Sequence, residues 1–260
     1  MKIAIGVLVF LAVQVAAMGW IGGRGPLRFL AAVRMGRLPG NAEEYHLENV
    51  QPCAESPLRG KTICFLGSSV TFGAASLGVS MADYIGVLDS CTIIKEAVSG
   101  TTLAGTDAST YVSRLLANVD ANAKIDIFVS QLSTNDASKE LPLGEISPGT
   151  DLTDFNRETV IGAMEYIIAY VRNTWDCDIV FYTGTKYESE TYAAMVNALL
   201  ALRDKWGIGV IDLWNDAEMN AVSEDDYRLY MSDKIHPTQA GYLKWWVPKF
   251  QKVLYKLSAD

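Results

Sequence analysis

The stretch TICFLGSSVTFG, residues 62–73, runs without a break from an apolar segment into a turn that is rich in serine and glycine. Residues 62–66 have the length and composition of a short buried strand. The serines that follow lie on the turn after this strand, at the carboxyl edge of a sheet, where open α/β folds bind their ligands. The stretch therefore predicts an α/β fold with a candidate serine nucleophile at its functional edge.

The same pattern of apolar strand and longer amphipathic segment repeats along the rest of the chain. The strand-like runs are residues 62–66, 91–98, 125–132, 178–183 and 208–213, and the helical patterns lie near residues 79–88, 108–119, 155–175 and 188–206. This alternation predicts a parallel sheet of about five strands with helices on both faces, connected by right-handed crossovers. We therefore expect a single three-layer α/β/α domain over residues 58–260.

Only two histidines occur in the 260 residues, and one of them, His236, follows Asp233 by three positions. An imidazole both accepts and donates a proton near neutral pH, and a carboxylate bonded to one ring nitrogen fixes the tautomer that leaves the other free. His236 is therefore a candidate general base, oriented by Asp233. The same motif also fits a helix N-terminal cap, because a helical pattern begins at Thr238 and continues to Phe250.

Two further segments end at the same predicted edge. Gly100 follows the apolar run 91–94, and a glycine allows a backbone N–H to approach a substrate oxygen closely. Asn135 follows the strand-like run 125–132, and its amide is a suitable donor to an oxyanion. An Asn-Asp pair after a strand is also typical of an Asx-turn or a helix cap.

Taken in order, these four segments resemble the four sequence blocks of the SGNH (GDSL-type) hydrolase family. The resemblance covers residues 60–257 and implies a flavodoxin-like fold. It also implies a nucleophile, Ser69, and a triad completed by Asp233 and His236. The implied oxyanion hole consists of the N–H groups of Ser69 and Gly100 and the side-chain amide of Asn135.

The chain departs from the family pattern at two positions. Ser68 replaces the aspartate that is usual before the nucleophile, and Ser133 replaces the glycine that is usual two residues before the asparagine. Neither position supplies the attacking atom or relays the proton. We therefore expect the chemistry to be retained, with the departures acting on the shape of the turn and of the acyl pocket.

The resemblance implies a serine esterase that hydrolyses acyl or acetyl esters of a carbohydrate, a lipid or a small molecule through an acyl-enzyme. Two alternatives stay open: an O-acyltransferase with the same triad, and a membrane-tethered glycan-binding protein without turnover. No cofactor or metal ion is expected, because the sequence has no Cys-x-x-Cys pair, no histidine-rich run and no P-loop lysine. The net charge of −8 argues against nucleic acid as a partner.

Two loops are candidates for substrate contacts. Residues 139–154 contain two prolines and two glycines and are either a lid or a plain connector. Residues 184–188 follow the fourth predicted strand and carry Lys186 and Tyr187 to the functional edge. These two side chains either contact the substrate or are merely solvated.

The N-terminus has a different character. Residues 3–23 are apolar except for Gln14 and are long enough to cross a bilayer, so residues 1–23 are expected to be a transmembrane anchor or a signal segment. Arginines after this segment favour a cytoplasmic domain, whereas an envelope esterase needs export, so the side of the membrane stays open. Residues 24–57 are expected to be a juxtamembrane helix and linker, in which His46 is solvated.

Overall fold

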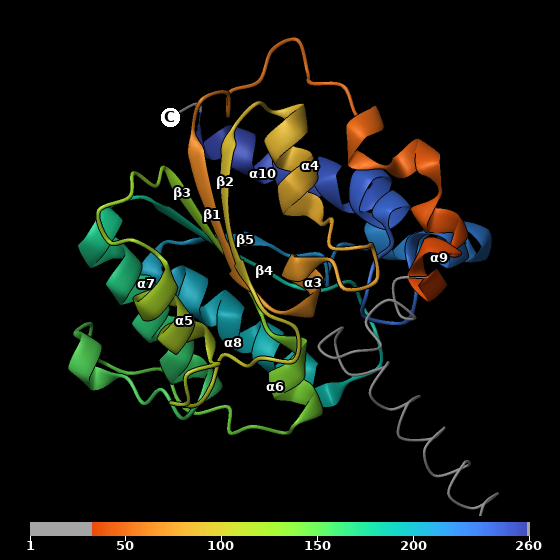
Figure 1. The fold of residues 1–260 in the computed structure, drawn as a ribbon. Coiled ribbons are helices and arrows are strands. Elements are labelled where there is room, and N and C mark those ends of the chain that lie inside the picture. The colour runs from red at the N-terminus through yellow and green to blue at the C-terminus, as the bar shows by residue number, and fades with distance from the viewer. Residues whose placement is uncertain (1–32, 259–260) are drawn as a thin grey trace, which may run out of the picture.

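The structure, a computed structural model, describes residues 33–258. One sheet of five parallel strands has the order β2-β1-β3-β4-β5 (Figure 1). The strands are β1 (Thr62–Gly67), β2 (Thr92–Ala97), β3 (Ile127–Gln131), β4 (Asp178–Tyr182) and β5 (Gly209–Ile211). The predicted strands are therefore confirmed, and the strand order is the flavodoxin-like one.

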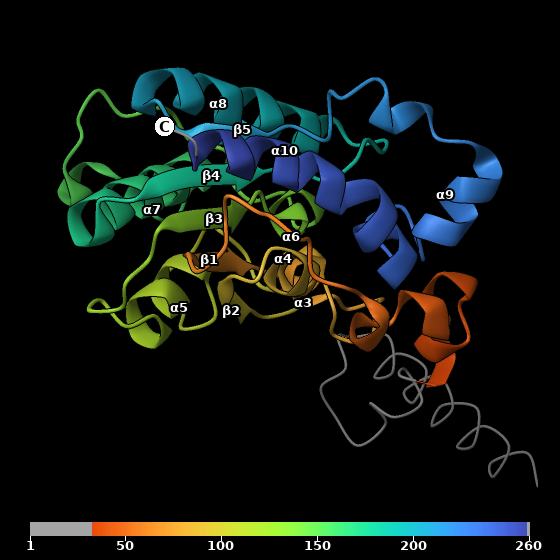
Figure 2. The ribbon, with the colours of Figure 1, turned by 90° about the horizontal axis from the view of Figure 1, so that it is seen from above.

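Helices cover both faces of the sheet and make the three layers that the alternating pattern predicted (Figures 1 and 2). One face is covered by α5 (Tyr111–Asn118), α6 (Thr134–Ser138), α7 (Val160–Trp175) and α8 (Glu190–Trp206). The other face is covered by α4 (Met81–Leu88), η6 (Gly241–Trp246) and α10 (Val247–Leu257). The shorter elements are η1 (Pro39–Asn41), η2 (Glu43–Tyr45), η3 (Leu47–Asn49), α3 (Ser69–Phe72), η4 (Leu152–Asp154), η5 (Met219–Ala221) and α9 (Glu224–Tyr230).

The strands divide their side chains between two cores. In β1, Ile63 and Phe65 pack against the α4 and α10 layer, whereas Cys64 and Leu66 pack against the α5, α7 and α8 layer. Successive side chains of a strand point to opposite faces, so a strand buried on both faces is apolar throughout. This accounts for the continuous apolar runs in the sequence.

The order of the strands places two strand ends at a switch point. The chain passes from β1 to β2 on one side and then to β3 on the other side of β1. The carboxyl ends of β1 and β3, at Gly67 and Gln131, therefore lie side by side where the crossovers diverge. Open α/β sheets bind their ligands at such a point.

The segment expected to be a linker is packed on the domain in its described part. Three 3-10 turns span residues 39–49, where Asn41 and Tyr45 are buried and Tyr84 Oη donates to the Tyr45 carbonyl over 2.6 Å. Residues 39–49, which precede the expected domain start at residue 58, are therefore in contact with the domain. Short 3-10 turns have no periodic apolar pattern, so a polar, irregular sequence concealed this packing.

The loop of residues 139–154 is hydrogen-bonded to the helices beside it. The Ser147 N–H donates to Glu165 in α7 over 2.9 Å, and Lys205 Nζ in α8 donates to the Ser147 carbonyl over 2.6 Å. These bonds hold the loop against the helices of one face, which favours the connector interpretation. The expected C-terminal helix consists of the π-helical η6 followed by α10, which has Pro248 in its first turn.

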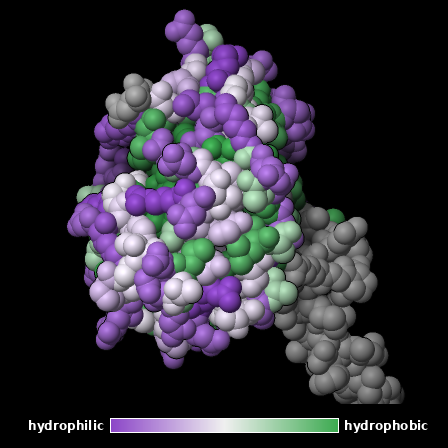
Figure 3. Space-filling view, turned by 90° about the vertical axis from the view of Figure 1, so that its left-hand side faces the viewer, coloured by the Kyte–Doolittle hydropathy of each residue, from purple (hydrophilic) through white to green (hydrophobic). Residues whose placement is uncertain are grey.

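No helix within residues 33–258 combines the length and the hydropathy that a membrane span requires. The apolar segment of residues 3–23 lies outside the described residues. The side of the molecule seen in Figure 3 carries polar side chains over most of its area, with smaller apolar areas between them.

Candidate active site

The candidate nucleophile lies on a tight turn between β1 and α3. Gly67 has no room for a side chain, because a Cβ there would overlap the Thr71 side chain and lie 2.8 Å from Gln131 Oε1. Ser68 is the N-cap of α3, and Ser69 is its first residue. Ser69 is 8% exposed. The turn therefore presents the Ser69 hydroxyl at the carboxyl edge of the sheet.

The structure joins Ser69, His236 and Asp233 in one hydrogen-bond chain. His236 Nε2 lies 2.9 Å from Ser69 Oγ, and His236 Nδ1 lies 2.9 Å from Asp233 Oδ2. When Nδ1–H donates to the carboxylate, Nε2 is left to accept the serine proton. Serine hydrolases activate a hydroxyl through such a chain.

Asp233 is held as an anion. Its partial burial raises its pKa, but the hydrogen bond and the charge of His236 outweigh that effect and lower the pKa to about 2. Asp233 Oδ1 also accepts from the backbone N–H groups of Ile235 and His236, over 2.8 and 2.9 Å. The carboxylate thus fixes the loop as well as the imidazole, and it does not cap a helix, because the next helix begins only at residue 239.

The loop that carries His236 is closed on itself. The Ser232 N–H donates to the His236 carbonyl over 2.9 Å, and Met231 pairs with Pro237 in an antiparallel bridge. These bonds restrict the position of the imidazole independently of Ser69.

The candidate oxyanion donors come from two loops that are bonded to each other. Gly100 has φ +82°, a left-handed conformation that favours glycine. Asn135 Nδ2 donates over 2.9 Å to the carbonyl of Thr101, the residue that follows Gly100. The second amide hydrogen of Asn135 is therefore left for another acceptor. Within residues 33–258, the N–H groups of Ser69 and Gly100 donate to no protein acceptor.

Asp136 connects the loop that follows Gly100 with the segment that carries Asn135. Its carboxylate accepts from the N–H groups of Leu103 and Ala104, each over 2.9 Å. Burial raises its pKa, although these bonds and the Ser133 hydroxyl act in the opposite direction. Asp136 therefore stabilises the backbone around Gly100 and does not face the candidate nucleophile's proton relay.

A buried ion pair connects the strand ends to the Gly100 loop. Arg114, in α5, is 4% exposed and pairs with Glu96 at the end of β2. Its Nη2 donates to the Gly67 carbonyl over 2.8 Å and to Thr101 Oγ1 over 3.1 Å. One guanidinium thus sets the spacing between the nucleophile turn and the loop that follows β2. This role of Arg114 was not predicted from the sequence, in which Glu96 and Arg114 are simply two residues of opposite charge on either side of Gly100.

Gln131 is a second residue that the sequence analysis missed. It ends β3, is 1% exposed, and its Oε1 accepts from Ser68 N over 2.9 Å and from Thr71 Oγ1 over 2.8 Å. Longer bonds reach Oε1 from Ser68 Oγ and Thr71 N. Thr71 Oγ1 also lies 2.6 Å from Tyr182 Oη. Gln131 therefore holds the turn on both sides of Ser69.

The two departures from the family pattern lie beside one buried tyrosine. Burial raises the pKa of Tyr111, and the hydroxyls of Ser68 and Ser133 both act to lower it. Ser133 Oγ also accepts from the Asn135 N–H over 3.2 Å as the N-cap of α6. The hydroxyl at position 133 thus helps to orient the candidate oxyanion donor.

Asn41 connects the N-terminal 3-10 turns by hydrogen bonds to the segment after α3 and to the segment after His236. Its Nδ2 donates to the Ala75 carbonyl, after α3, over 2.7 Å, and its Oδ1 accepts from the Gln239 N–H, after His236, over 2.8 Å. The side chain is buried. The N-terminal turns therefore support the relative position of the nucleophile and the histidine.

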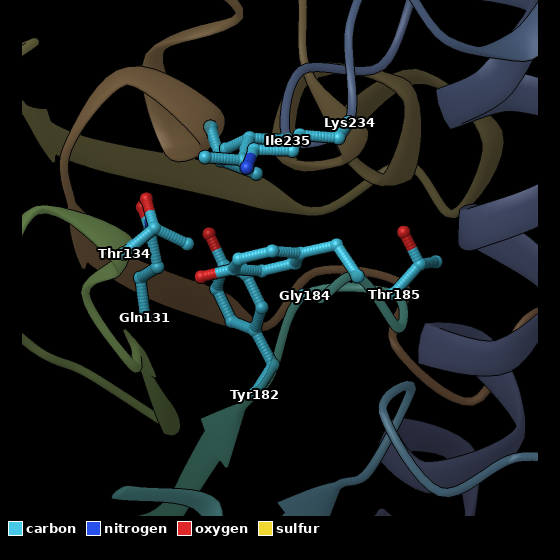
Figure 4. A pocket seen from close by; sticks show the side chains of 9 residues that line it. Gln131, Thr134, Tyr182, Gly184, Thr185, Lys234 and Ile235 are labelled. Carbon is cyan, nitrogen blue, oxygen red and sulfur yellow. The ribbon is translucent and has the colours of Figure 1, made fainter. Parts of the chain in front are cut away.

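A narrow pocket adjoins the candidate site, because Ser69, Asn135 and His236 each have a direct sequence neighbour in its wall, although none of the three lines it (Figure 4). Its walls are Val70, Gln131, Thr134, Tyr182, Gly184, Thr185, Tyr187, Lys234 and Ile235. Val70 follows the candidate nucleophile, Thr134 precedes Asn135, and Lys234 lies between Asp233 and His236. Of the two loop residues singled out in the sequence, the pocket therefore contains Tyr187 but not Lys186.

The comparisons with known proteins show the family and the fold of the chain. The model of the GDSL-like lipase/acylhydrolase family matches residues 65–244, and the chain belongs to this family. The family name describes enzymes that cleave acyl esters, so membership supports ester hydrolysis as the general activity. None of the curated proteins compared with the chain matches it.

Solved structures share the fold at low sequence identity. A putative lipolytic protein of the G-D-S-L family from Desulfitobacterium hafniense is 19% identical, with a TM-score of 0.57 over 75% of this chain and 99% of that one. A possible lipase from Chitinophaga pinensis is 16% identical, with a TM-score of 0.56 over 76% and 99%. A family two carbohydrate esterase from Clostridium thermocellum is 14% identical, with a TM-score of 0.51 over 80% and 64%.

Proposed function

We propose that the protein is a serine esterase that hydrolyses short-chain carboxylic esters of a carbohydrate or a small molecule through an acyl-enzyme. The observation that supports this most strongly is the hydrogen-bond chain from Ser69 through His236 to Asp233. In this proposal Ser69 is the nucleophile, His236 the general base and acid, and Asp233 the group that orients His236 and stabilises its cation.

The reaction proceeds in two steps. Ser69 Oγ attacks the ester carbonyl carbon while His236 Nε2 takes the hydroxyl proton, and the carbonyl oxygen becomes an oxyanion. The tetrahedral intermediate collapses, the bond to the alcohol breaks, and His236 protonates the departing alcohol. Water then attacks the acyl-enzyme with His236 as base, which releases the acid and restores Ser69.

The oxyanion accepts from the N–H groups of Ser69 and Gly100 and from the free amide hydrogen of Asn135. These donors are fixed before the substrate arrives, by Gln131 on the turn and by Arg114 and Asp136 on the Gly100 loop. Preorganised donors of this kind contribute about 3 kcal/mol each to the lowering of the barrier.

The size of the pocket supports a short acyl group. Its free volume is about 10 Å³, which is about the room for one water molecule. The aromatic rings of Tyr187, Tyr192 and Trp214 pack against one another behind it, with centroids 5.1–5.3 Å apart. A long alkyl chain has no room there without moving this cluster.

The test is hydrolysis by the full-length protein. We expect release of free acetate from 4-nitrophenyl acetate, with much slower release of acid from the octanoate, and no enzymatic release in the Ser69→Ala variant. Adding a sugar acceptor and measuring acetyl transfer separates a hydrolase from an acyltransferase. Rates for Ser69→Ala equal to those of the wild type would overturn the proposal.

We also propose that residues 3–23 attach the protein to a membrane, a proposal that rests on their apolar sequence alone. Fractionation of cells that express the full chain, or a chain beginning at residue 33, tests it. We expect the full chain in the membrane fraction, and recovery of both chains in the soluble fraction would refute the attachment.

A further inference from the structure

We propose that the pocket adjoining the candidate site binds a carboxylate group of the ester substrate through Lys234 and Tyr187. The inference rests on the proposed esterase function and adds the chemical class of the substrate. The carboxylate belongs either to a dicarboxylic acyl group or to an acidic alcohol, such as a sugar acid.

Lys234 is the only charged residue among the nine that line the pocket. It lies between Asp233 and His236, so the fixed loop of the candidate histidine also fixes its backbone. Its Nζ is 5.7 Å from the centroid of the Tyr187 ring, and Figure 4 shows its side chain extending along the top of the pocket. The cation is thus held over the pocket by a contact with one of its walls.

The ammonium group has no anionic partner in the described part of the chain. Asp233, its neighbour in sequence, directs both carboxylate oxygens to His236. No carboxylate is among the nine residues that line the pocket. In a protein with a net charge of −8, the pocket is therefore a local site that favours an anion.

Tyr187 supplies an independent observation. Its hydroxyl is buried and makes no hydrogen bond of ordinary length and angle within residues 33–258, although the Ser189 side chain lies near enough to lower its pKa, and buried polar groups are rarely left unpaired. Burial raises the pKa of Tyr187 to about 12, so the group is a donor at neutral pH. Trp214 and Tyr192 pack on the ring, each at a centroid distance of 5.3 Å, and fix its direction.

The two groups are complementary to one carboxylate. The pocket has room for about one water-sized group, so one carboxylate oxygen enters it and accepts from the Tyr187 hydroxyl, while the other oxygen stays at the mouth of the pocket and faces the Lys234 ammonium. Thr134, another residue of the pocket wall, precedes Asn135, so the pocket adjoins the segment that carries a candidate oxyanion donor. Binding of the substrate carboxylate by these two side chains raises kcat/KM, and neither side chain takes part in the proton relay.

The experiment compares matched charged and neutral esters with the full-length protein. One pair varies the alcohol, as 3-carboxyphenyl acetate and 3-carbamoylphenyl acetate. The other pair varies the acyl group, as 4-nitrophenyl hemisuccinate and 4-nitrophenyl butyrate. Each kcat/KM is divided by the rate constant for hydroxide hydrolysis of the same ester, which removes intrinsic reactivity. We expect the charged ester to be preferred about tenfold in one of the pairs, and that pair identifies the side of the ester that carries the carboxylate.

Lys234→Met keeps the length of the side chain and removes the charge, and we expect it to reduce the preference to about one. Tyr187→Phe removes only the hydroxyl and is expected to reduce it about threefold. Lys186→Met is the matched control, because it removes a lysine from the same edge but outside the pocket, and it is expected to keep the wild-type preference.

A preference near one in both pairs, or an unchanged preference in Lys234→Met, would overturn the inference. In either case hydrolysis of the neutral esters would continue, so the proposed esterase function would stand. Absence of hydrolysis of all four esters would instead overturn the proposed function, and the inference with it.

Discussion

Replacing Gln131 with leucine should loosen the turn that carries Ser69. The substitution keeps a side chain of similar size in a buried position and removes the oxygen that accepts from Ser68 N and Thr71 N. The two hydroxyl donors are less affected, because Thr71 Oγ1 keeps Tyr182 Oη at 2.6 Å and the Ser68 hydroxyl is free to rotate. We therefore calculate the loss of folding stability from the two backbone N–H groups alone.

Each buried donor left without an acceptor costs about 1–3 kcal/mol, so the loss of the acceptor for two donors in Gln131→Leu should lower the free energy of unfolding by about 2–6 kcal/mol. That is a large part of the 5–15 kcal/mol or so that is typical of a domain. A displacement of the turn by about 1 Å also lowers kcat by roughly a hundredfold in the folded fraction.

Urea unfolding at neutral pH, followed by tryptophan fluorescence, measures the first effect, and kcat under conditions where the variant is folded measures the second. Gln239→Leu is the matched control. Gln239 is equally buried but makes only one longer side-chain bond, of 3.2 Å to the Ser76 carbonyl, so it should lose less than about 1.5 kcal/mol. Equal losses in the two variants, or a full kcat in Gln131→Leu, would refute the role given to Gln131.

Three further predictions concern other parts of the site. Asn135→Ala should lower kcat about a hundredfold with little change in KM in steady-state assays, and an effect confined to KM would make Asn135 a substrate contact instead. The pKa of Asp233 is lowered from 3.8 to about 2 in the folded protein, so its stabilising contribution is complete above about pH 4 and is lost as the pH falls towards 2. Urea unfolding at several pH values should show that Asp233→Asn has a weaker pH dependence in this window, and identical slopes would contradict the assignment. Asn41→Ala removes two buried hydrogen bonds and should lower the free energy of unfolding by about 2 kcal/mol and reduce kcat, and a wild-type kcat would limit Asn41 to a structural role.

The fold was predictable because its signals are local. Each strand is a short apolar run, and α7 and α8 are long enough to show their periodicity in the sequence. Three of the four candidate segments, at Ser69, Gly100 and Asn135, were predictable because each follows a strand, and parallel strands bring their carboxyl ends to one edge. The fourth segment follows α9 and was singled out by the spacing of Asp233 and His236, and the fold brings it to Ser69.

The supporting residues were not predictable, because their roles depend on contacts between distant parts of the chain. Gln131 is one polar residue in a strand, and only the pairing of β1 with β3 brings it to the nucleophile turn. Arg114 acts across α5, β1 and the Gly100 loop at once. Asn41 lies in a segment without a periodic pattern, almost 200 residues before Gln239. These bonded partners are separated by 13 to 198 residues, and local sequence patterns do not connect positions so far apart.

The central claim is that Ser69 is an activated nucleophile. The most direct measurement is to react the folded full-length protein with a fluorophosphonate probe, which labels activated serines, and to map the modified residue by mass spectrometry beside the Ser69→Ala and His236→Ala variants. The account predicts labelling at Ser69 in the wild type, none in Ser69→Ala and a rate at least a hundredfold lower in His236→Ala, because the hydroxyl then lacks its base. Labelling at Ser68 or another residue, or no labelling of the folded wild type, would contradict the account.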